Sequence, residues 1–382
     1  SQREIDYFRH LPPQLQNPAT ERSGALALIT HARAADLLGD TATALDNANE
    51  AVRLLQRGGD RSDATLVMLG RVYTALGGII TDRNPSDPKS HAVLVRAADL
   101  LRPMAERPGA SVSARQAYAE ALILLGWRNG KSGRGDEAAR EELEAMRMAV
   151  KLRAERPTDP ALVLDYSLAG AWLTGALDDL GRTDEARRTG EDALAVVNQL
   201  LVQRPEDREA LANKAILETG LAFATAYGLA PAAARRFASQ AIHAQLALVR
   251  LEPANTEYVN NLGAAYYALA RASWQAGRLR EAIAAGRRGM ESFGQAGTSG
   301  FVLRNVAFGT ANAAYMQVLS EDPERTVSTV AAGNAFLSPS RVHALGLTSE
   351  AVIHATQAFP VAALVYERGD SAAALRMARA AL

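Results

Sequence analysis

The segment 126–138, GWRNGKSGRGDEA, holds two patterns that could bind phosphate. GKS at 130–132 matches the end of a P-loop, and GRGDEA at 133–138 matches a loose dinucleotide fingerprint, Gly-x-Gly-x-x-Ala. Both motifs need a strand before the glycines, and a P-loop needs four residues between its first two glycines. Gly126 and Gly130 have three residues between them, and the preceding AYAEALILLGW has a helical pattern. We therefore predict an exposed turn here, with no nucleotide site.

Acid–base and metal chemistry find equally little support. No two histidines stand three or four residues apart, so no helix presents a pair of metal ligands. The four carboxylates Glu137, Glu141, Glu142 and Glu144 flank Arg140, and we expect a solvated helix face there. The six histidines are His10, His31, His91, His243, His343 and His354. We predict no catalytic residues, no metal and no cofactor, and hence no enzyme.

Composition narrows the class of protein further. The 382 residues contain 42 Lys+Arg and 42 Asp+Glu, so no net charge directs the chain to nucleic acid. Hydrophobic residues make up 48% but aromatics only 5%, which favours helix, and cysteine is absent. No apolar run is long enough to cross a membrane, so we predict no membrane insertion. Because the chain starts without Met, we expect a piece of a longer protein, cytoplasmic, or periplasmic if a missing upstream part carries a membrane helix.

A period of about 48 residues runs through the chain. The prolines of AERPGAS, AERPTDP, VQRPEDR and RLEPANT lie at 108, 157, 205 and 253, with spacings of 49, 48 and 48. Pro18, Gly58, Gly300 and Gly346 occupy or approach the same slot in other units. About eight units therefore tile the sequence, and repeats of this length are typical of solenoids.

A second mark lies within each unit and predicts a helical hairpin. Glycines recur at 39, 133, 181, 228, 277 and 369, and an alanine follows five residues later at 44, 138, 186, 233, 282 and 374. Alanine or glycine stands twelve residues after these glycines, and only Gln240 departs. Each unit opens on a cap such as Asp159-Pro160, glycine ends its first helix, and small residues let the second helix approach closely.

The predicted fold is all-α, a right-handed α-solenoid of about eight antiparallel hairpins in a single domain over 1–382. Residues 1–17 form a lead-in. Two segments are irregular: 77–90, where Gly77-Gly78 opens a long loop, and 320–345, where Pro339 should break a helix. The expected hairpins are 18–57, 58–107, 108–156, 157–204, 205–252, 253–299, 300–345 and 346–382.

These units resemble tetratricopeptide repeats. DLGRTDEARRTGEDAL and QAGRLREAIAAGRRGM carry the glycine, alanine and small-residue spacing, and LGAAY at 262–266 and LGRVY at 69–73 match the first-helix signature. The units depart from the family in being near 48 residues long rather than 34, which implies longer helices. Similar long arrays occur in bacterial multi-domain signalling proteins, and the resemblance implies protein interaction as the function.

One row of polar residues is the candidate binding site. The resemblance implies that first helices line a concave groove, and Asn261 stands just before Leu262-Gly263, where peptide-binding members carry a groove asparagine. No basic residues surround Asn261, so the family's carboxylate clamp is not expected. A row that is merely solvated is the alternative. The row, eight residues past the junctions, is Gln116, Asp165, Asn213 and Asn261, flanked by Tyr166, Tyr258 and Tyr267.

Three functions stay open at this point. The first is a non-catalytic scaffold or regulatory region that binds a peptide, a protein partner or an attached signalling domain on the concave face. The second is a sensor with a small ligand enclosed by the superhelix. The third is self-association through the last hairpin, whose apolar face around Val361, Leu364 and Leu375 has no capping helix. We read Trp127, Trp172 and Trp274 as inter-repeat core, and the arginines at 107, 156 and 204 as helix-end caps.

Overall fold

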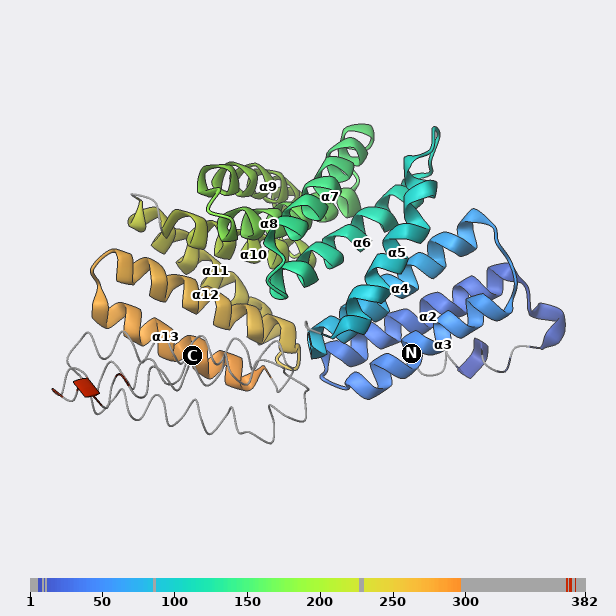
Figure 1. The fold of residues 1–382 in the computed structure, drawn as a ribbon, viewed down its shortest axis with the longest axis horizontal. Helices are drawn as coiled ribbons and strands as arrows, with labels where there is room; N and C mark the ends of the chain where they lie inside the picture. Colours follow the sequence, from blue (N-terminus) through green and yellow to red (C-terminus); the bar gives the residue numbers. More distant parts are fainter. Residues whose placement is uncertain are drawn as a thin grey trace. The chain divides into compact units, whose positions relative to one another are not determined.

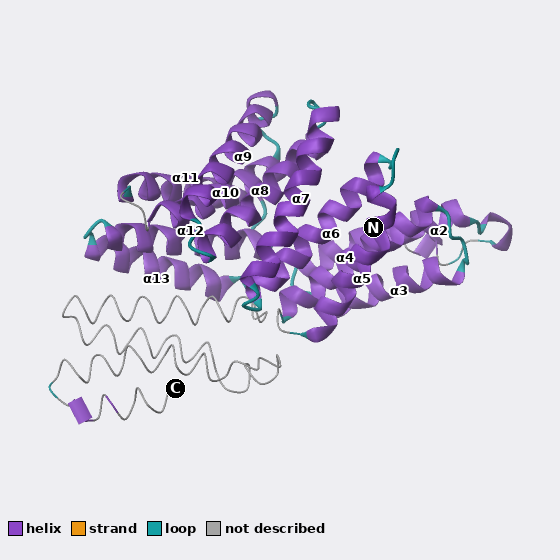
Figure 2. Cartoon of the chain, turned by 45° about the horizontal axis from the view of Figure 1, so that its top comes forward, coloured by secondary structure: helices purple, strands orange, loops and turns teal. Residues whose placement is uncertain are grey.

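The structure, a computed structural model, describes residues 6–8, 10, 12–84, 87–226 and 230–296, and residues 369, 371–372 and 375 near the C-terminus. Within those ranges the regular elements are all helices, twelve α-helices and one short 3-10 helix (Figure 2). The expected hairpin at 300–345 and all but four residues of the one at 346–382 lie outside the described residues, as do Pro339, Val361 and Leu364. Leu375 is described and is 52% exposed.

The chain divides into two compact units. The first comprises residues 1–182 and 195–205, and the second comprises residues 183–194 and 206–382. The helix α9 (Thr183–Gln203) contributes residues to both units. The expectation of a single repeat domain over 1–382, and of right-handed stacking, stays a prediction.

The first unit is a series of helices that pack in chain order (Figure 1). Each helix contacts the next, and the first helices of successive hairpins also contact one another: α4 packs against α2 and α6, and α6 packs against α8. The first helices therefore form one layer. The elements are η1(Pro13–Leu15), α2(Pro18–Leu37), α3(Thr41–Arg57), α4(Asp63–Arg83), α5(Pro88–Glu106), α6(Val112–Lys131), α7(Gly135–Glu155) and α8(Pro160–Asp179).

The second unit repeats this arrangement. Besides part of α9 it contains α10(Arg208–Ala226), α11(Pro231–Leu251), α12(Thr256–Gln275) and α13(Leu279–Gln295). Here α10 packs against α11 and α12, and α12 packs against α13. Six of the expected hairpin ranges thus each hold two described helices.

Capping and glycine turns explain where the helices begin and end. The Asp159 side chain accepts a hydrogen bond from the Ala161 backbone N–H at 3.1 Å, and Pro160 follows as the first helical residue. The turns between the helices of four hairpins contain a glycine in the left-handed region, which other residues rarely adopt. These glycines are Gly39, Gly133, Gly181 and Gly277, with φ of 79°, 79°, 73° and 68°.

Pairs of small residues seven positions apart lie at the contact between the helices of a hairpin. Ala138 and Ala145 are both fully buried, as are Ala44 and Ala51 in the first hairpin. The prediction was wrong by one residue in the fifth hairpin, where Ala233 is half-buried and Gln240 exposed. Ala234 and Ala241 take the buried positions there, because α11 begins one residue later relative to its turn.

The predicted long loop at 77–90 is also corrected. Gly77 and Gly78 lie inside α4, which continues to Arg83, and α5 begins at Pro88. Gly77 is needed for packing, because a Cβ there would lie 2.5 Å from Leu94 Cγ on α5. The hydroxyls of Thr81 and Ser90 hydrogen-bond across the same contact.

One described helix, α4, is long and apolar enough by length and composition to cross a membrane. Most of its apolar window is buried, and it packs against α2, α3, α5 and α6. A core helix of a helical array meets the same criterion.

Candidate functional site

The first helices of the first unit present a half-buried row away from their second helices. On α6 the buried positions Ala114, Tyr118, Ala121 and Leu125 recur every three or four residues and face the core. Gln116, Glu120 and Leu124 lie on the other side of that helix and are half-buried. We call the first-helix face the set Arg71 on α4, Gln116, Glu120 and Leu124 on α6, and Asp165, Leu168 and Trp172 on α8.

Polar contacts join neighbouring helices at one end of the first-helix face. Gln116 Nε2 donates a hydrogen bond to Asp165 Oδ2 at 2.8 Å, so two members of the predicted row meet between α6 and α8. One turn further along, Arg71 and Glu120 form an ion pair at 3.8 Å between α4 and α6. Partly buried pairs of this kind fix the register of the helices while leaving oxygen atoms that can accept further hydrogen bonds.

Apolar and aromatic side chains occupy the other end. The rings of Trp127 and Trp172 lie 5.9 Å apart between α6 and α8, an inter-repeat contact as expected for these two tryptophans. Leu124 Cδ1 lies 3.4 Å from the position that a Cβ at Gly78 would take, so the leucine packs against this glycine. Trp274 packs against Ala270, Ala282 and their neighbours in its own hairpin, and its expected inter-repeat contact stays a prediction.

The predicted site residues of the second unit differ in exposure. Asn213 is buried, with 5% of its surface exposed, whereas Asn261 is half-buried. Tyr267 is half-buried and packs on Phe223 with ring centroids 5.8 Å apart. Tyr258 is half-buried, and the pKa of its hydroxyl is raised by burial and by the nearby charge of Glu252.

First-helix tyrosines are covered by arginines of second helices, a pattern that sequence reasoning missed. Tyr166 is 7% exposed and lies beneath the Arg153 guanidinium, 4.7 Å from the ring centre, so this predicted site residue offers little surface. Tyr118 accepts from Arg102 Nε at 3.0 Å and donates to Glu144 at 2.6 Å. Burial raises the pKa of Tyr118 to about 12.

The carboxylates of α7 are not all solvated, which corrects the prediction for Glu141 and Glu142. Glu142 is 2% exposed and lies against Gly126, where a Cβ would be 2.5 Å from its Cγ. It shares the buried side of α7 with Ala138 and Ala145. Burial raises the pKa of Glu142 well above its usual value, and burial raises the pKa of Glu141 to about 7 although Asn129 donates to it at 2.8 Å.

The glycine-rich segment has the context of a hairpin turn. The helix α6 continues to Lys131, and Gly133 takes the left-handed conformation before α7 begins at Gly135. Ser132 is half-buried rather than exposed, and its hydroxyl donates to the Arg128 carbonyl at 2.9 Å. A helix rather than a strand precedes the motif, so the required phosphate-binding geometry is missing. The described residues also hold no group of three side chains placed to bind a metal ion.

Ion pairs close the open ends of several hairpins. Arg115 Nη2 lies 2.6 Å from Glu155 Oε2, joining the start of α6 to the end of α7. Asp63 with Arg107 and Arg208 with Glu252 do the same in two other hairpins. Arg107 is the C-cap residue of α5 and its side chain also forms this ion pair, so its expected role at the helix end stays a prediction. The Asp63–Arg107 and Arg208–Glu252 pairs are largely exposed, and exposed pairs of this kind contribute little to stability.

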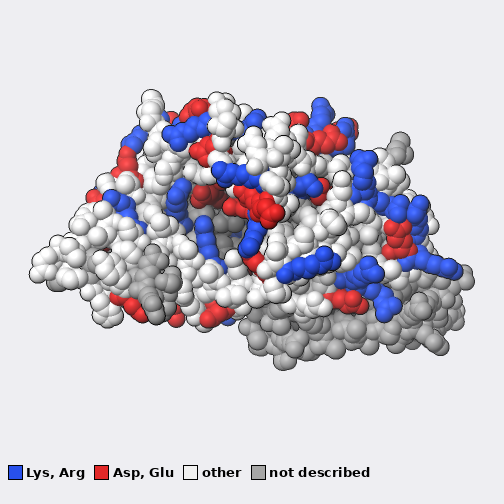
Figure 3. Space-filling model, turned by 180° about the vertical axis from the view of Figure 1, so that it is seen from behind, with Lys and Arg blue, Asp and Glu red and all other residues white. Residues whose placement is uncertain are grey.

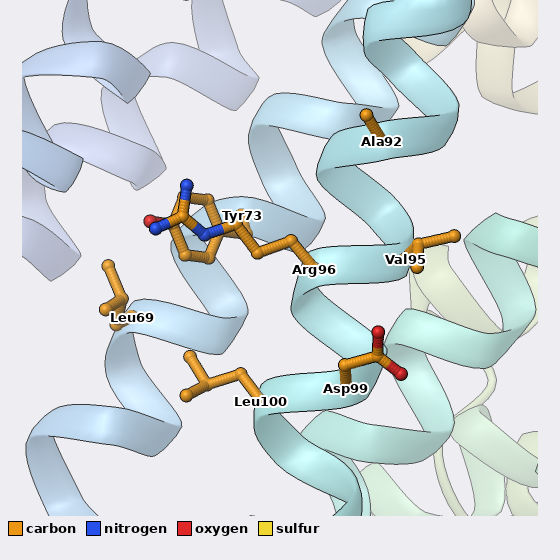
Figure 4. A pocket seen from close by; sticks show the side chains of 7 residues that line it. All are labelled: Leu69, Tyr73, Ala92, Val95, Arg96, Asp99 and Leu100. Atoms are coloured by element: carbon orange, nitrogen blue, oxygen red, sulfur yellow. The ribbon is translucent and has the colours of Figure 1, made fainter.

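A groove of about 460 Å³ lies on the second hairpin between α4 and α5 (Figure 4). Leu69 and Tyr73 on α4 and Val95, Arg96 and Leu100 on α5 line it, together with Ala92 and Asp99. Figure 4 shows the Arg96 guanidinium extended across the Tyr73 ring, at 4.8 Å from its centre. On the face drawn in Figure 3, basic and acidic side chains are interspersed, in keeping with equal numbers of each in the sequence.

Comparison with known proteins identifies the fold. No family model and no curated protein sequence matches the chain. Among solved structures, a Rap protein complexed with Competence and Sporulation Factor matches with a TM-score of 0.57 and 11% identity, over 93% of this chain and 85% of that chain. Weaker likenesses include the apo form of RapI, with a TM-score of 0.49 and 10% identity over 94% and 97% of the two chains. BtubC from P. vanneervenii matches with a TM-score of 0.47 and 15% identity, over 65% and 89%.

The chain is therefore an all-α, tetratricopeptide-like helical-repeat protein, as its repeat pattern indicated. At 11% identity this likeness establishes the fold alone, and any binding partner has to be inferred from the residues of this chain.

Proposed function

We propose that this chain is a non-catalytic interaction module that binds a peptide or protein partner on its first-helix face. The carrying observation is the layer of first helices, whose outward row combines polar groups at one end with a half-exposed Trp172 and Leu168 at the other. Aromatic side chains flanked by polar groups are the composition that protein-binding surfaces favour.

Two further observations support this proposal. Almost every described residue belongs to a helical hairpin, and Glu142, the carboxylate whose pKa is raised well above its usual value, is buried between helices. The Rap protein of similar fold was solved with Competence and Sporulation Factor bound, so a fold of this kind can hold such a factor. A regulatory role in a larger bacterial signalling protein, and a cytoplasmic location, are part of the proposal.

The test begins with peptides selected from a random display library on the intact chain. Their affinity is then measured for the wild type, for Glu120→Arg and Asp165→Arg, and for Lys151→Glu as a control on the exposed side of α7. We expect the two face variants to weaken binding at least about tenfold, because they reverse charges at a partly desolvated contact, and the control to bind as the wild type does.

A double variant, Arg71→Glu with Glu120→Arg, keeps the ion pair with its direction reversed. It separates loss of contact from loss of folding, because its melting temperature should stay near that of the wild type. Selected peptides that bind all variants equally would show that another surface carries the interaction.

A further inference from the structure

The groove between α4 and α5 contains a positioned cation that has no carboxylate partner. Arg96 is exposed and forms no ion pair with any described residue, although it lies flat on the Tyr73 ring at 4.8 Å. Tyr73 is itself fixed, because it is 4% exposed and its hydroxyl accepts from Gln56 Nε2 on α3 at 2.8 Å. The stack on Tyr73 restricts the guanidinium before any ligand binds. Binding a ligand therefore costs less side-chain entropy than it would for a freely moving arginine.

The acid that lines the groove is paired with another arginine rather than with Arg96. Asp99, the acid that lines it, lies 3.8 Å from Arg102 one turn further along α5. Arg102 is also close to Glu144, so the charges of Asp99, Arg102 and Glu144 act on one another and Arg96 is the cation without an ion-pair partner among the described residues. A carboxylate in the groove would meet Arg96 as its counterion, and the planar guanidinium can bind such a group through two hydrogen bonds.

An apolar surface adjoins the cation at a defined spacing. Leu100 stands one helical turn after Arg96, and Leu69 on α4 lies beside it (Figure 4). Residues one turn apart on a helix are separated by about 5–6 Å. Side chains two residues apart on one face of an extended chain are separated by about 6.6 Å, so the two spacings agree.

We propose that this groove binds an extended segment of a partner protein with the pattern acid–x–apolar. The acidic side chain contacts the Arg96 guanidinium, and the apolar side chain packs on Leu69 and Leu100. The groove is open and lined by only seven residues. Because small-molecule sites enclose most of their ligand, an open groove fits a segment of a longer chain that is also held elsewhere. This site is separate from the first-helix face, so either proposal can fail without the other.

The experiment uses capped peptides on the intact chain, so that no terminal charge contributes. The first is acetyl-Gly-Glu-Ser-Leu-Gly-amide, the second has Gln in place of Glu, and the third exchanges Ser and Leu to break the spacing. Saturation-transfer NMR at millimolar peptide measures weak binding. We expect the first peptide to bind about two- to fivefold more tightly than the second, which is the effect of an ion pair at an exposed arginine.

Two variants assign the effect to Arg96. Arg96→Gln should abolish the preference for Glu over Gln, whereas Arg153→Gln, which removes an arginine–tyrosine stack between α7 and α8, should preserve it. Arg96 is exposed and Arg153 is half-buried, and melting temperatures confirm that both variants fold. Equal binding of the Glu and Gln peptides, a preference that survives in Arg96→Gln, or indifference to the Glu–Leu spacing would each overturn the proposal.

Discussion

At the scale of single residues, Glu142 is an acid buried where no described side chain hydrogen-bonds its Oε2 atom. Its neighbours include Glu141 and Asp179, which repel its charge, and Lys131, which attracts it. Burial outweighs these charges and raises the pKa, so the protonated form is the one that the fold accommodates. Gly126 on α6 leaves the space for the Glu142 side chain, because any larger residue there would bring its Cβ too close to Glu142 Cγ.

This burial makes stability depend on pH. The folded-state pKa values of Glu141 and Glu142 exceed their unfolded values, so their stabilisation is fully present below the unfolded pKa and is lost as the pH rises through the folded pKa. For Glu141 that interval ends near a pKa of about 7. As the pH rises between the unfolded and the folded pKa of one such group, the free energy of unfolding falls by up to about 1.4 kcal/mol per pH unit.

We predict that Glu142→Gln raises the free energy of unfolding at pH ~8 by about 1–3 kcal/mol and changes it little at pH ~5, because an amide of the same shape needs no proton to stay neutral. Urea unfolding at the two pH values measures the difference. Glu106→Gln, at an exposed position near the end of α5, is the control and should change neither value. Equal effects of Glu142→Gln at both pH values would contradict the argument.

Gln245 on α11 is a second buried polar residue. It is fully buried, and neither its amide nitrogen nor its amide oxygen has a hydrogen-bond partner among the described residues. We predict that Gln245→Met, of nearly the same shape, raises the free energy of unfolding by about 1 kcal/mol by removing unsatisfied groups. Thermal melts compare it with Gln240→Met, on the exposed side of the same helix. A lower melting temperature for Gln245→Met alone would indicate an internal water or a bond that the amide needs.

At the scale of elements, the Leu-Gly-x-x-Tyr signature has a packing reason. A Cβ at Gly263 would lie 2.5 Å from Phe293 Cδ1 on α13, and one at Gly70 would lie 2.5 Å from Leu101 Cγ on α5. In each case the missing side chain lets a large residue of the second helix lie against the first helix. Glycine lowers the intrinsic stability of the first helix, and the close packing that it permits between the two helices offsets this loss.

We predict that Gly263→Ala lowers the free energy of unfolding by about 1–3 kcal/mol through overpacking against Phe293. Gly175→Ala is the matched control, since it is also helical and a Cβ there would meet nothing within 4 Å. The control should stabilise the chain by about 0.5–1 kcal/mol through helix propensity. Chemical denaturation of both variants tests the pair, and a stabilising Gly263→Ala would show that Phe293 moves aside easily.

The same elements show which parts of the structure a sequence can predict. The turn glycines at 133 and 181 and the small pairs such as Ala138 with Ala145 follow local rules of backbone and packing, so their roles could be predicted. The prediction for Gly77 and Gly78 was wrong, because helix propensity opposes them but Gly77 packs against Leu94 and Gly78 against Leu124 inside α4.

In the candidate site, too, some features could be predicted from the sequence and others could not. Gln116 and Asp165 were placed in one row by the period, but the hydrogen bond between them depends on how α6 packs on α8. The groove at Arg96 gave no periodic signal, because its stack on Tyr73 depends on rotamers and on Gln56 of another helix. The acidic neighbours of Glu142 also led to the wrong prediction of a solvated side chain. Its helical spacing from Ala138 and Ala145 could have indicated the buried side of α7.

At the scale of the whole molecule, stability is a sum of local contacts. Within each unit, the described helices that pack together are neighbours or next neighbours along the chain. In such arrays each repeat is stabilised by its own helices and by the adjacent interfaces, so a defect in one hairpin should not spread far.

Hydrogen exchange on a damaged hairpin tests that locality. Gly70→Ala overpacks Leu101 in the second hairpin, so we predict faster amide exchange in α4 and α5 and, more weakly, in α3 and α6, which pack on them. Amides of α12 and α13 should exchange as in the wild type. Gly263→Ala should give the converse pattern, with faster exchange in α12 and α13 and unchanged α4 and α5. If either variant raised exchange equally in all described helices, the chain would unfold as one cooperative body, and the affinity changes expected for first-helix variants would have to be separated from global loss of structure.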